Sequence, residues 1–95
     1  MSKLNWITNK IIDREQLVHR VNAWRTLDKK IVFTNGCFDI LHHGHLQLLA
    51  ATADQGDVLI VGVNSDSSVK RLKGEDRPIY HEQDRLFQLA ALLHV

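Results

Sequence analysis

One stretch of the sequence decides the fold: Phe33-Thr34-Asn35-Gly36-Cys37-Phe38-Asp39-Ile40-Leu41-His42-His43-Gly44-His45. It begins at the end of an apolar run of strand length and finishes where a helix-forming run starts. Between the two it carries glycines, an aspartate and three histidines. In α/β proteins, a strand that passes through a glycine-containing turn into a helix builds a phosphate site, because the backbone N–H groups and the dipole of the helix start attract an anion. The stretch therefore predicts an anion-binding turn.

The segments on either side of this turn predict an α/β fold. Residues 31–34 and 58–63 are apolar and rich in β-branched side chains, without regular polar alternation, so we expect both strands to be buried on both faces. The run 46–53 between them favours a helix that ends near Gly56, a plausible C-cap. The order strand, helix, strand predicts a Rossmann-like parallel sheet with flanking helices.

Three further helices are expected. Asp13 is a predicted N-cap, and Gln16 stands three residues later at the capping-box spacing, so we place a helix over 14–28. A short helix is expected near 67–72. Another over 81–93 presents an apolar stripe made of Leu86, Leu89, Ala90 and Leu93.

We divide the chain into a leader with its helix, residues 1–28, and the first part of a larger domain, residues 29–95. The apolar residues of 1–12 predict that the leader packs against something. Two strands leave two unpaired sheet edges, and the sequence finishes on an apolar run up to Val95. We therefore expect the sheet to be incomplete within the 95 residues, with further strands after Val95 or with a second copy covering the open edge.

The composition gives no electrostatic case for a nucleic-acid or membrane partner, because the formal net charge is only +1. Cys37 is the only cysteine, which excludes an intrachain disulfide and fits a reducing cytoplasm. No apolar run approaches the ~18 residues that a membrane span needs. We therefore expect a cytoplasmic protein.

The histidines of the opening stretch have several possible roles. His42 and His45 are three apart, so both rings fall on one face of a helix start, where they can donate to a phosphate. Gly36 and Gly44 let a ligand approach the backbone closely. Three alternatives stay open: zinc held by Asp39, His42, His43 and His45; a Cys37–histidine nucleophile pair; and histidines that only satisfy a helix start.

Residues 36–45 resemble the G-x-F-D-x-x-H-x-G-H signature of the HxGH nucleotidyltransferases. Around it, four stretches resemble the adenylyltransferase domain of ADP-heptose synthases, over about residues 11–95: Val32–Asp39, Val61–Asp66, Val69–Gly74 and Arg77–Ile79. His43 departs from the pattern, since proline is common there; the position is a spacer, so we expect little consequence.

The resemblance implies transfer of AMP from ATP to D-glycero-β-D-manno-heptose 1-phosphate, with release of pyrophosphate, in the synthesis of a lipopolysaccharide core precursor. Mg²⁺ would shield the triphosphate. The implied catalytic residues are His42, His45 and Lys73. The implied nucleotide-binding residues are Asn35, Gly36, Cys37, Phe38, Asp39, His42, Gly44, His45, Asn64, Asp66, Lys70 and Arg85, and no residue is assigned to a metal.

Some of these assignments have ordinary structural alternatives. Lys70 and Lys73 could be solvated charges, Asp66 a helix cap, and Arg85 a structural residue. Asp39 is expected to fix the turn rather than act as a base.

Two other functions are also considered. One is a cytidylyltransferase that acts on glycerol 3-phosphate or a similar alcohol phosphate. The other is a non-catalytic nucleotide-binding or assembly module, because the Ser/Thr-rich motif that closes over the nucleotide in this superfamily is not found within the 95 residues.

Overall fold

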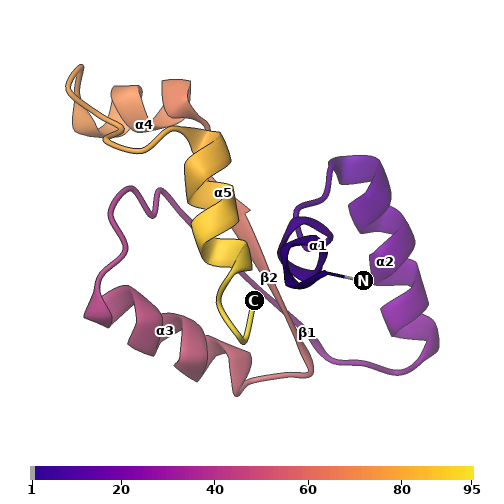
Figure 1. Cartoon of the computed structure of the whole chain (residues 1–95). Helices are drawn as coiled ribbons and strands as arrows, with labels where there is room; N and C mark the ends of the chain where they lie inside the picture. The colour runs from indigo at the N-terminus through magenta and orange to yellow at the C-terminus, as the bar shows by residue number, and fades with distance from the viewer. Residues whose placement is uncertain (1) are drawn as a thin grey trace.

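A computed structural model describes residues 2–95 and confirms the α/β class (Figure 1). Its elements follow the chain in the order α1 (Lys3–Thr8), α2 (Arg14–Thr26), β1 (Ile31–Gly36), α3 (His43–Ala53), β2 (Val58–Val63), α4 (Asp66–Lys73) and α5 (Glu82–Ala90).

The two strands pair in parallel, as predicted, in a register that runs from Ile31 opposite Val58 to Gly36 opposite Val63. Strand β1 is two residues longer than predicted, because Asn35 and Gly36 still pair with β2. Just beyond the ladder, the N–H of Asn64 donates to the carbonyl of Gly36 at 3.0 Å. The segments that follow β1 and β2 therefore leave the sheet side by side at its carboxyl end, where ligands bind in open α/β sheets.

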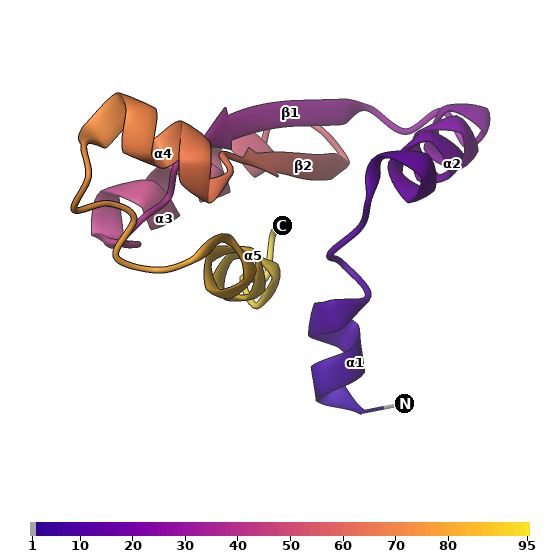
Figure 2. The same cartoon turned by 90° about the horizontal axis from the view of Figure 1, so that it is seen from above.

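One face of the sheet is covered and the other is open. Figures 1 and 2 show α3 and α5 on the same side of the strands, while α2 lies apart from them and α1 contacts α5. The core joins one side chain each from the turn, α3, β2 and α5, namely Phe38, Leu49, Leu59 and Leu89.

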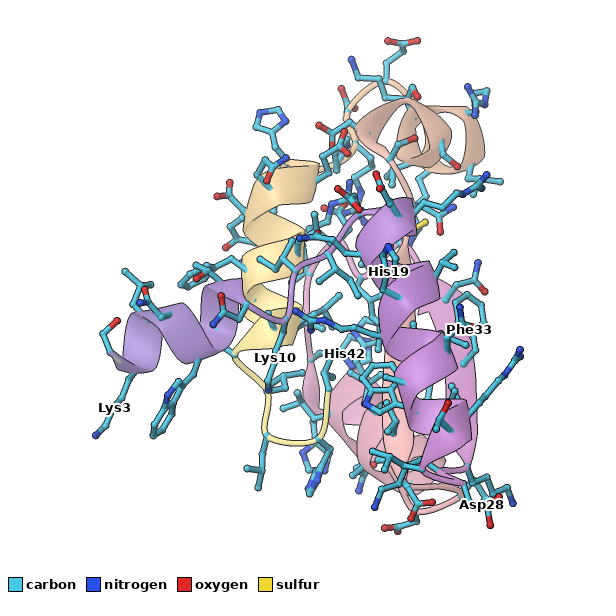
Figure 3. The ribbon with its side chains drawn as sticks, turned by 90° about the vertical axis from the view of Figure 1, so that its right-hand side faces the viewer. Lys3, Lys10, His19, Asp28, Phe33 and His42 are labelled. Atoms are coloured by element: carbon cyan, nitrogen blue, oxygen red, sulfur yellow. The ribbon has the colours of Figure 1, made fainter. Side chains whose placement is uncertain are left out.

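The prediction that β1 is buried on both faces is wrong for the described residues. The side chain of Phe33 is 63% exposed, and its ring lies over Gly62, where an added Cβ would approach it to 3.0 Å. The physical reason is a groove of about 500 Å³ that separates α2 from β2 and α5 on this side. Figure 3 labels Phe33 beside α2.

Helix α2 confirms the predicted capping box of Asp13 and Gln16. Asp13 Oδ1 accepts from the N–H of Gln16 at 2.8 Å, and Gln16 Oε1 accepts from the N–H of Asp13 at 3.1 Å. Helix α1 of the leader contacts α5. In addition, Lys10 Nζ, labelled in Figure 3, donates to the carbonyl of Leu92 at 3.0 Å. The expected packing of residues 1–12 is thus found only in part: Trp6 is 58% exposed, Ile7, Ile11 and Ile12 are partly buried, and Met1 lies outside the described residues.

Three helix ends differ from the predictions. Helix α2 ends at Thr26, short of residue 28, and α5 covers only Glu82–Ala90, so that Leu93 lies beyond it and is 85% exposed. Helix α3 ends with Asp54 as its cap, so Gly56 is not the C-cap. A glycine is needed at position 56 for a steric reason instead, because a Cβ there would lie 2.6 Å from Val32 Cγ2. Within residues 2–95, no helix is long and apolar enough to cross a bilayer.

Candidate nucleotide-binding site

The turn between β1 and α3 is shaped by Phe38. This residue has a φ of 46°, in the left-handed region that non-glycine residues rarely adopt and that costs roughly 1–3 kcal/mol. Its ring is buried beneath Gly36, where a Cβ would approach it to 3.0 Å, and its edge meets the ring of His45 at a centroid distance of 5.5 Å. Burial of an aromatic side chain thus offsets the backbone strain and holds the turn against the first helical residues.

His42 and His45 form a stacked pair at the start of α3. Their ring centroids are 3.8 Å apart and their planes differ by 27°. His42 is the N-cap: its Nδ1 accepts from the N–H of Gly44 at 3.0 Å, while His45 Nδ1 accepts from the N–H of His42 at 3.4 Å. A neutral ring whose Nδ1 accepts carries its proton on Nε2. The pair therefore caps the helix through Nδ1, and each ring, when neutral, carries its proton on Nε2.

His45 stays neutral more readily than an ordinary histidine. Desolvation by burial lowers its pKa below 6.5, helped by the charges of His42 and Lys73, and a hydrogen bond at the Ile40 backbone opposes the shift. The influence of Lys73 is notable, because this residue comes from the last turn of α4. A lysine ammonium and the histidine pair therefore share one electrostatic environment.

The residues of the turn line a cavity of about 560 Å³. Its walls include eight of the predicted site residues: Asn35, Gly36, Cys37, Phe38, Asp39, His42, His45 and Lys73. Three wall residues were not predicted, namely Ile40, Leu48 and Arg77. Arg77 stands in the Arg-Pro-Ile stretch that carries part of the family resemblance, which is the signal that could have pointed to it.

Asp39 reaches this wall but keeps its carboxylate inside the protein. The side chain is only 3% exposed. Its Oδ2 accepts from Arg77 Nη1 at 2.7 Å, and its Oδ1 accepts from the backbone N–H groups of Ile79 and Tyr80 at 2.8 and 3.2 Å. Asp39 thus fastens the loop after α4 to the turn before α3.

Arg85, which the resemblance assigns to nucleotide binding, does not line the cavity. Its side chain is completely buried. Nε donates to the carbonyl of Tyr80, Nη1 to those of Cys37 and Asn64, and Nη2 to Asp66 Oδ1, all between 2.7 and 3.0 Å. Arg85 therefore binds the ends of both strands to α4 and α5, in the structural role that was the stated alternative.

Asp66 and Asn64 also lie outside the cavity wall and belong to this buried cluster. Asp66 is the first residue of α4, and the cap is Ser65, whose Oγ accepts from the N–H of Ser68. Partial desolvation would raise the pKa of Asp66, but the hydrogen bond and charge of Arg85, with smaller effects of Glu82 and His81, lower it on balance. Asn64 Nδ2 donates to Ser68 Oγ at 3.0 Å. The two residues support the site without facing it.

Gly44 and Lys70 are likewise absent from the cavity wall. A Cβ on Gly44 would lie 2.9 Å from His42 Cε1 and 3.2 Å from its Nδ1, so the glycine makes room for the capping ring. Lys70 lies in the last turn of α4, near its basic C-terminal end. The cavity therefore receives its lysine from position 73.

The donor set does not suit a protein-held metal. Within residues 2–95, no group of three or more His, Cys, Asp or Glu side chains is arranged to hold an ion. Asp39, the one carboxylate of the cavity wall, already accepts three protein hydrogen bonds. The arrangement thus gives no support to the zinc alternative, and what it offers a ligand is neutral and cationic hydrogen-bond donors.

This chain is similar to known proteins in sequence and in structure. A family model described as Cytidylyltransferase-like matches residues 33–95. The bifunctional protein HldE of Methylobacillus flagellatus is 51% identical over 88% of this chain and 17% of the relative, and that of Helicobacter pylori strain P12 is 56% identical over 94% and 18%. The chain spans less than a fifth of the length of these relatives.

A solved structure is similar as well. The crystal structure of the lipopolysaccharide core biosynthesis protein from Thermoplasma volcanium superposes with a TM-score of 0.64 and 35% sequence identity, over 70% of this chain and 53% of that one. The two proteins therefore share a fold over most of this chain.

Proposed function

Since this chain belongs to the cytidylyltransferase-like family of nucleotidyltransferases, we propose that it binds ATP in the cavity beside α3 and transfers AMP to a sugar 1-phosphate, specifically a heptose 1-phosphate. Residues 29–95 form the first part of the nucleotidyltransferase domain, and residues 1–28 are its leader, with α1 and α2.

The reaction forms one phosphorus–oxygen bond and breaks another. An oxygen of the sugar phosphate attacks the α-phosphorus of ATP, and the bond from that phosphorus to the oxygen bridging to the β-phosphorus breaks. Pyrophosphate leaves with the electron pair, and an ADP-sugar remains. Because the nucleophile is already an anion, the site needs no strong base; it must align the two phosphates and stabilise the charge that develops.

The stacked pair of His42 and His45 is the single observation that carries this proposal. Both rings accept at Nδ1, from Gly44 and His42 respectively, and both border the cavity. A neutral imidazole donating from Nε2 stabilises charge on a phosphate oxygen without giving up its proton. The start of α3 adds its dipole to the same place.

The remaining wall residues have supporting roles in this account. Lys73 supplies a positive charge, and the turn of Asn35, Gly36, Cys37 and Phe38 lies against the nucleotide. Lys70 adds charge at a distance. Asp39, Asn64, Asp66 and Arg85 hold the wall in shape.

Mg²⁺ accompanies the nucleotide in this proposal and is not held by the protein. Magnesium prefers oxygen ligands and is commonly bound by substrate phosphates together with one or two carboxylates. Among the described residues, the only carboxylate of this cavity wall is Asp39, whose Oδ2 already accepts from Arg77 and whose Oδ1 accepts from the N–H groups of Ile79 and Tyr80. The wall residues therefore do not fit a protein-bound Mg²⁺.

The sugar acceptor is supported by the family resemblance and by the solved relative, which is described as a lipopolysaccharide core biosynthesis protein. We further propose that the protein works in the cytoplasm, where ATP and sugar phosphates are found, without a nucleic-acid or membrane partner. The exposed ring of Phe33 favours a second copy over the open side of the sheet. Light scattering coupled to gel filtration tests that assembly.

Pyrophosphate release tests the reaction. ATP and CTP are each offered with heptose 1-phosphate and with glycerol 3-phosphate, in the presence of Mg²⁺. Release from ATP and heptose 1-phosphate is expected. Release from CTP and glycerol 3-phosphate would identify the cytidylyltransferase alternative, and calorimetric binding of ATP without any turnover would identify a non-catalytic module.

A further inference from the structure

Two arginines follow α4 in the sequence, and the structure uses them differently. The guanidinium of Arg85 is completely buried and donates four hydrogen bonds to the protein. The side chain of Arg77 is 34% exposed and lines the cavity. Within residues 2–95, the guanidinium of Arg77 makes one hydrogen bond, from Nη1 to Asp39 Oδ2 at 2.7 Å.

Most of the hydrogen-bonding capacity of Arg77 is therefore left for something else. A guanidinium has five N–H donors in a rigid planar fork. Asp39 takes one of them, and its own position is fixed by the backbone N–H groups of Ile79 and Tyr80. Arg77 is thus held in place from one side while its other donors stay free of protein partners among the described residues. That is a preorganised donor set at a cavity wall.

The charges around Arg77 identify the class of ligand. The carboxylate of Asp39 offsets the charge of Arg77, so the net positive charge of the wall comes from Lys73, with both histidines as neutral or cationic donors. Lys73 also acts on His45, which places the two cationic side chains and the histidine pair around one space. A planar fork beside an ammonium matches a group with several anionic oxygens, that is, a phosphate.

We propose that Arg77 is a substrate-binding residue that binds a phosphate group in this cavity. The inference rests on the proposed function, because it assigns a further residue to the same site. The phosphate has two possible sources, the triphosphate of ATP and the 1-phosphate of the sugar acceptor.

Calorimetric titration of the whole chain with Mg·ATP, and separately with heptose 1-phosphate, tests the proposal. Arg77→Gln is expected to weaken binding of one ligand by about ten-fold or more, as loss of charge-assisted hydrogen bonds does. Arg77→Lys keeps a cation for Asp39 but loses the fork, so a smaller weakening of the same ligand is expected. Arg71→Gln is the matched control, because Arg71 is exposed and lies outside the cavity wall.

The outcomes separate the proposal from its premise. Weaker binding of ATP alone assigns Arg77 to the triphosphate, and weaker binding of the sugar phosphate alone assigns it to the acceptor; either supports the proposal. Unchanged affinities in Arg77→Gln, or full affinity in Arg77→Lys if the glutamine variant does not fold, would overturn it. Failure of the unchanged chain to bind either ligand would overturn the proposed function as well. Thermal melting without ligand shows whether a variant is folded.

Discussion

The ring centroids of His42 and His45 lie 3.8 Å apart, and each ring accepts a backbone hydrogen bond at Nδ1. This relationship joins helix capping to ligand binding. The nitrogens that satisfy the helix start fix the tautomer, and the fixed tautomer directs the proton to Nε2. Loss of either ring therefore removes a cap and a donor together, and the predictions below are designed to separate the two effects.

Gly44→Ala tests the position of the His42 ring separately from the stability of α3. Alanine favours a helix over glycine by up to about 1 kcal/mol, and this offsets the roughly 1 kcal/mol lost when the His42 cap is displaced, so the free energy of unfolding should change little. The new Cβ would lie 2.9 Å from His42 Cε1, so the His42 ring must move and ATP affinity should fall about ten-fold. Urea unfolding and calorimetry measure the two quantities. A stable variant with unchanged ATP affinity would contradict the role given to His42.

His45→Ala should weaken ATP binding about ten-fold, and where pyrophosphate release is measurable it should lower turnover by roughly 10²-fold or more, as loss of a charge-stabilising donor does. The matched control is His43→Ala, two positions away on α3, because His43 is exposed and does not border the cavity. Equal effects in the two variants would show that the loss is general to the helix start.

The titration of His45 should follow its lowered pKa. NMR titration of the histidine ring protons is expected to give His45 a midpoint below 6.5, and Lys73→Met should raise that midpoint because it removes one of the charges that lower it. A midpoint at or above 6.5 in the unchanged chain would contradict the neutral donor proposed here.

The same pKa has a consequence for stability. An unfolded chain takes up the proton at His45 more readily than the folded chain, because the pKa of His45 is lower in the folded state. Above pH 6.5 the ring is neutral in both states, so His45 does not lower the free energy of unfolding there. As the pH falls from 6.5 through the folded-state pKa, His45 lowers the free energy of unfolding by an increasing amount.

A bound phosphate should raise the pKa of His45 again, so ATP binding is expected to be accompanied by proton uptake in this pH range. Calorimetry in buffers of different ionisation enthalpy measures that uptake.

Arg85→Met should destabilise the fold by about 3 kcal/mol, because it leaves the partly buried carbonyls of Cys37 and Asn64 without their donor. Urea unfolding measures the loss, and Arg71→Met on the exposed side of α4 serves as the control. A loss below 1 kcal/mol would mean that Arg85 does not tie the two strand ends together.

Local features of the fold could be predicted from the sequence, and long-range ones could not. The capping box of Asp13 and Gln16 depends on neighbours three residues apart, so the pattern alone predicts it. The exposure of Phe33 depends on how α2 lies relative to β2 and α5, which no local pattern encodes. The strand pattern predicted burial because a parallel sheet is usually covered on both faces.

The candidate site also has a local part that the sequence predicts and a long-range part that it does not. The turn from Asn35 to His45 is continuous in sequence, and eight of the predicted residues, Lys73 among them, line one cavity. The roles of Arg77 and Arg85 depend on contacts over 38 and 48 positions, to Asp39 and to the carbonyl of Cys37. Two arginines with similar local surroundings thus differ in burial, and only the tertiary structure separates a cavity residue from a structural one.

Backbone amide NMR during a titration with Mg·ATP tests whether the turn between β1 and α3 binds the nucleotide. We expect saturable shifts of the amides of Gly36, Phe38, Gly44 and His45, with Lys73 and Arg77 following the same binding curve, while the amides of α1 and α2 do not shift. Shifts confined to the groove between α2, β2 and α5, or no saturable shift at the turn between β1 and α3, would contradict this expectation.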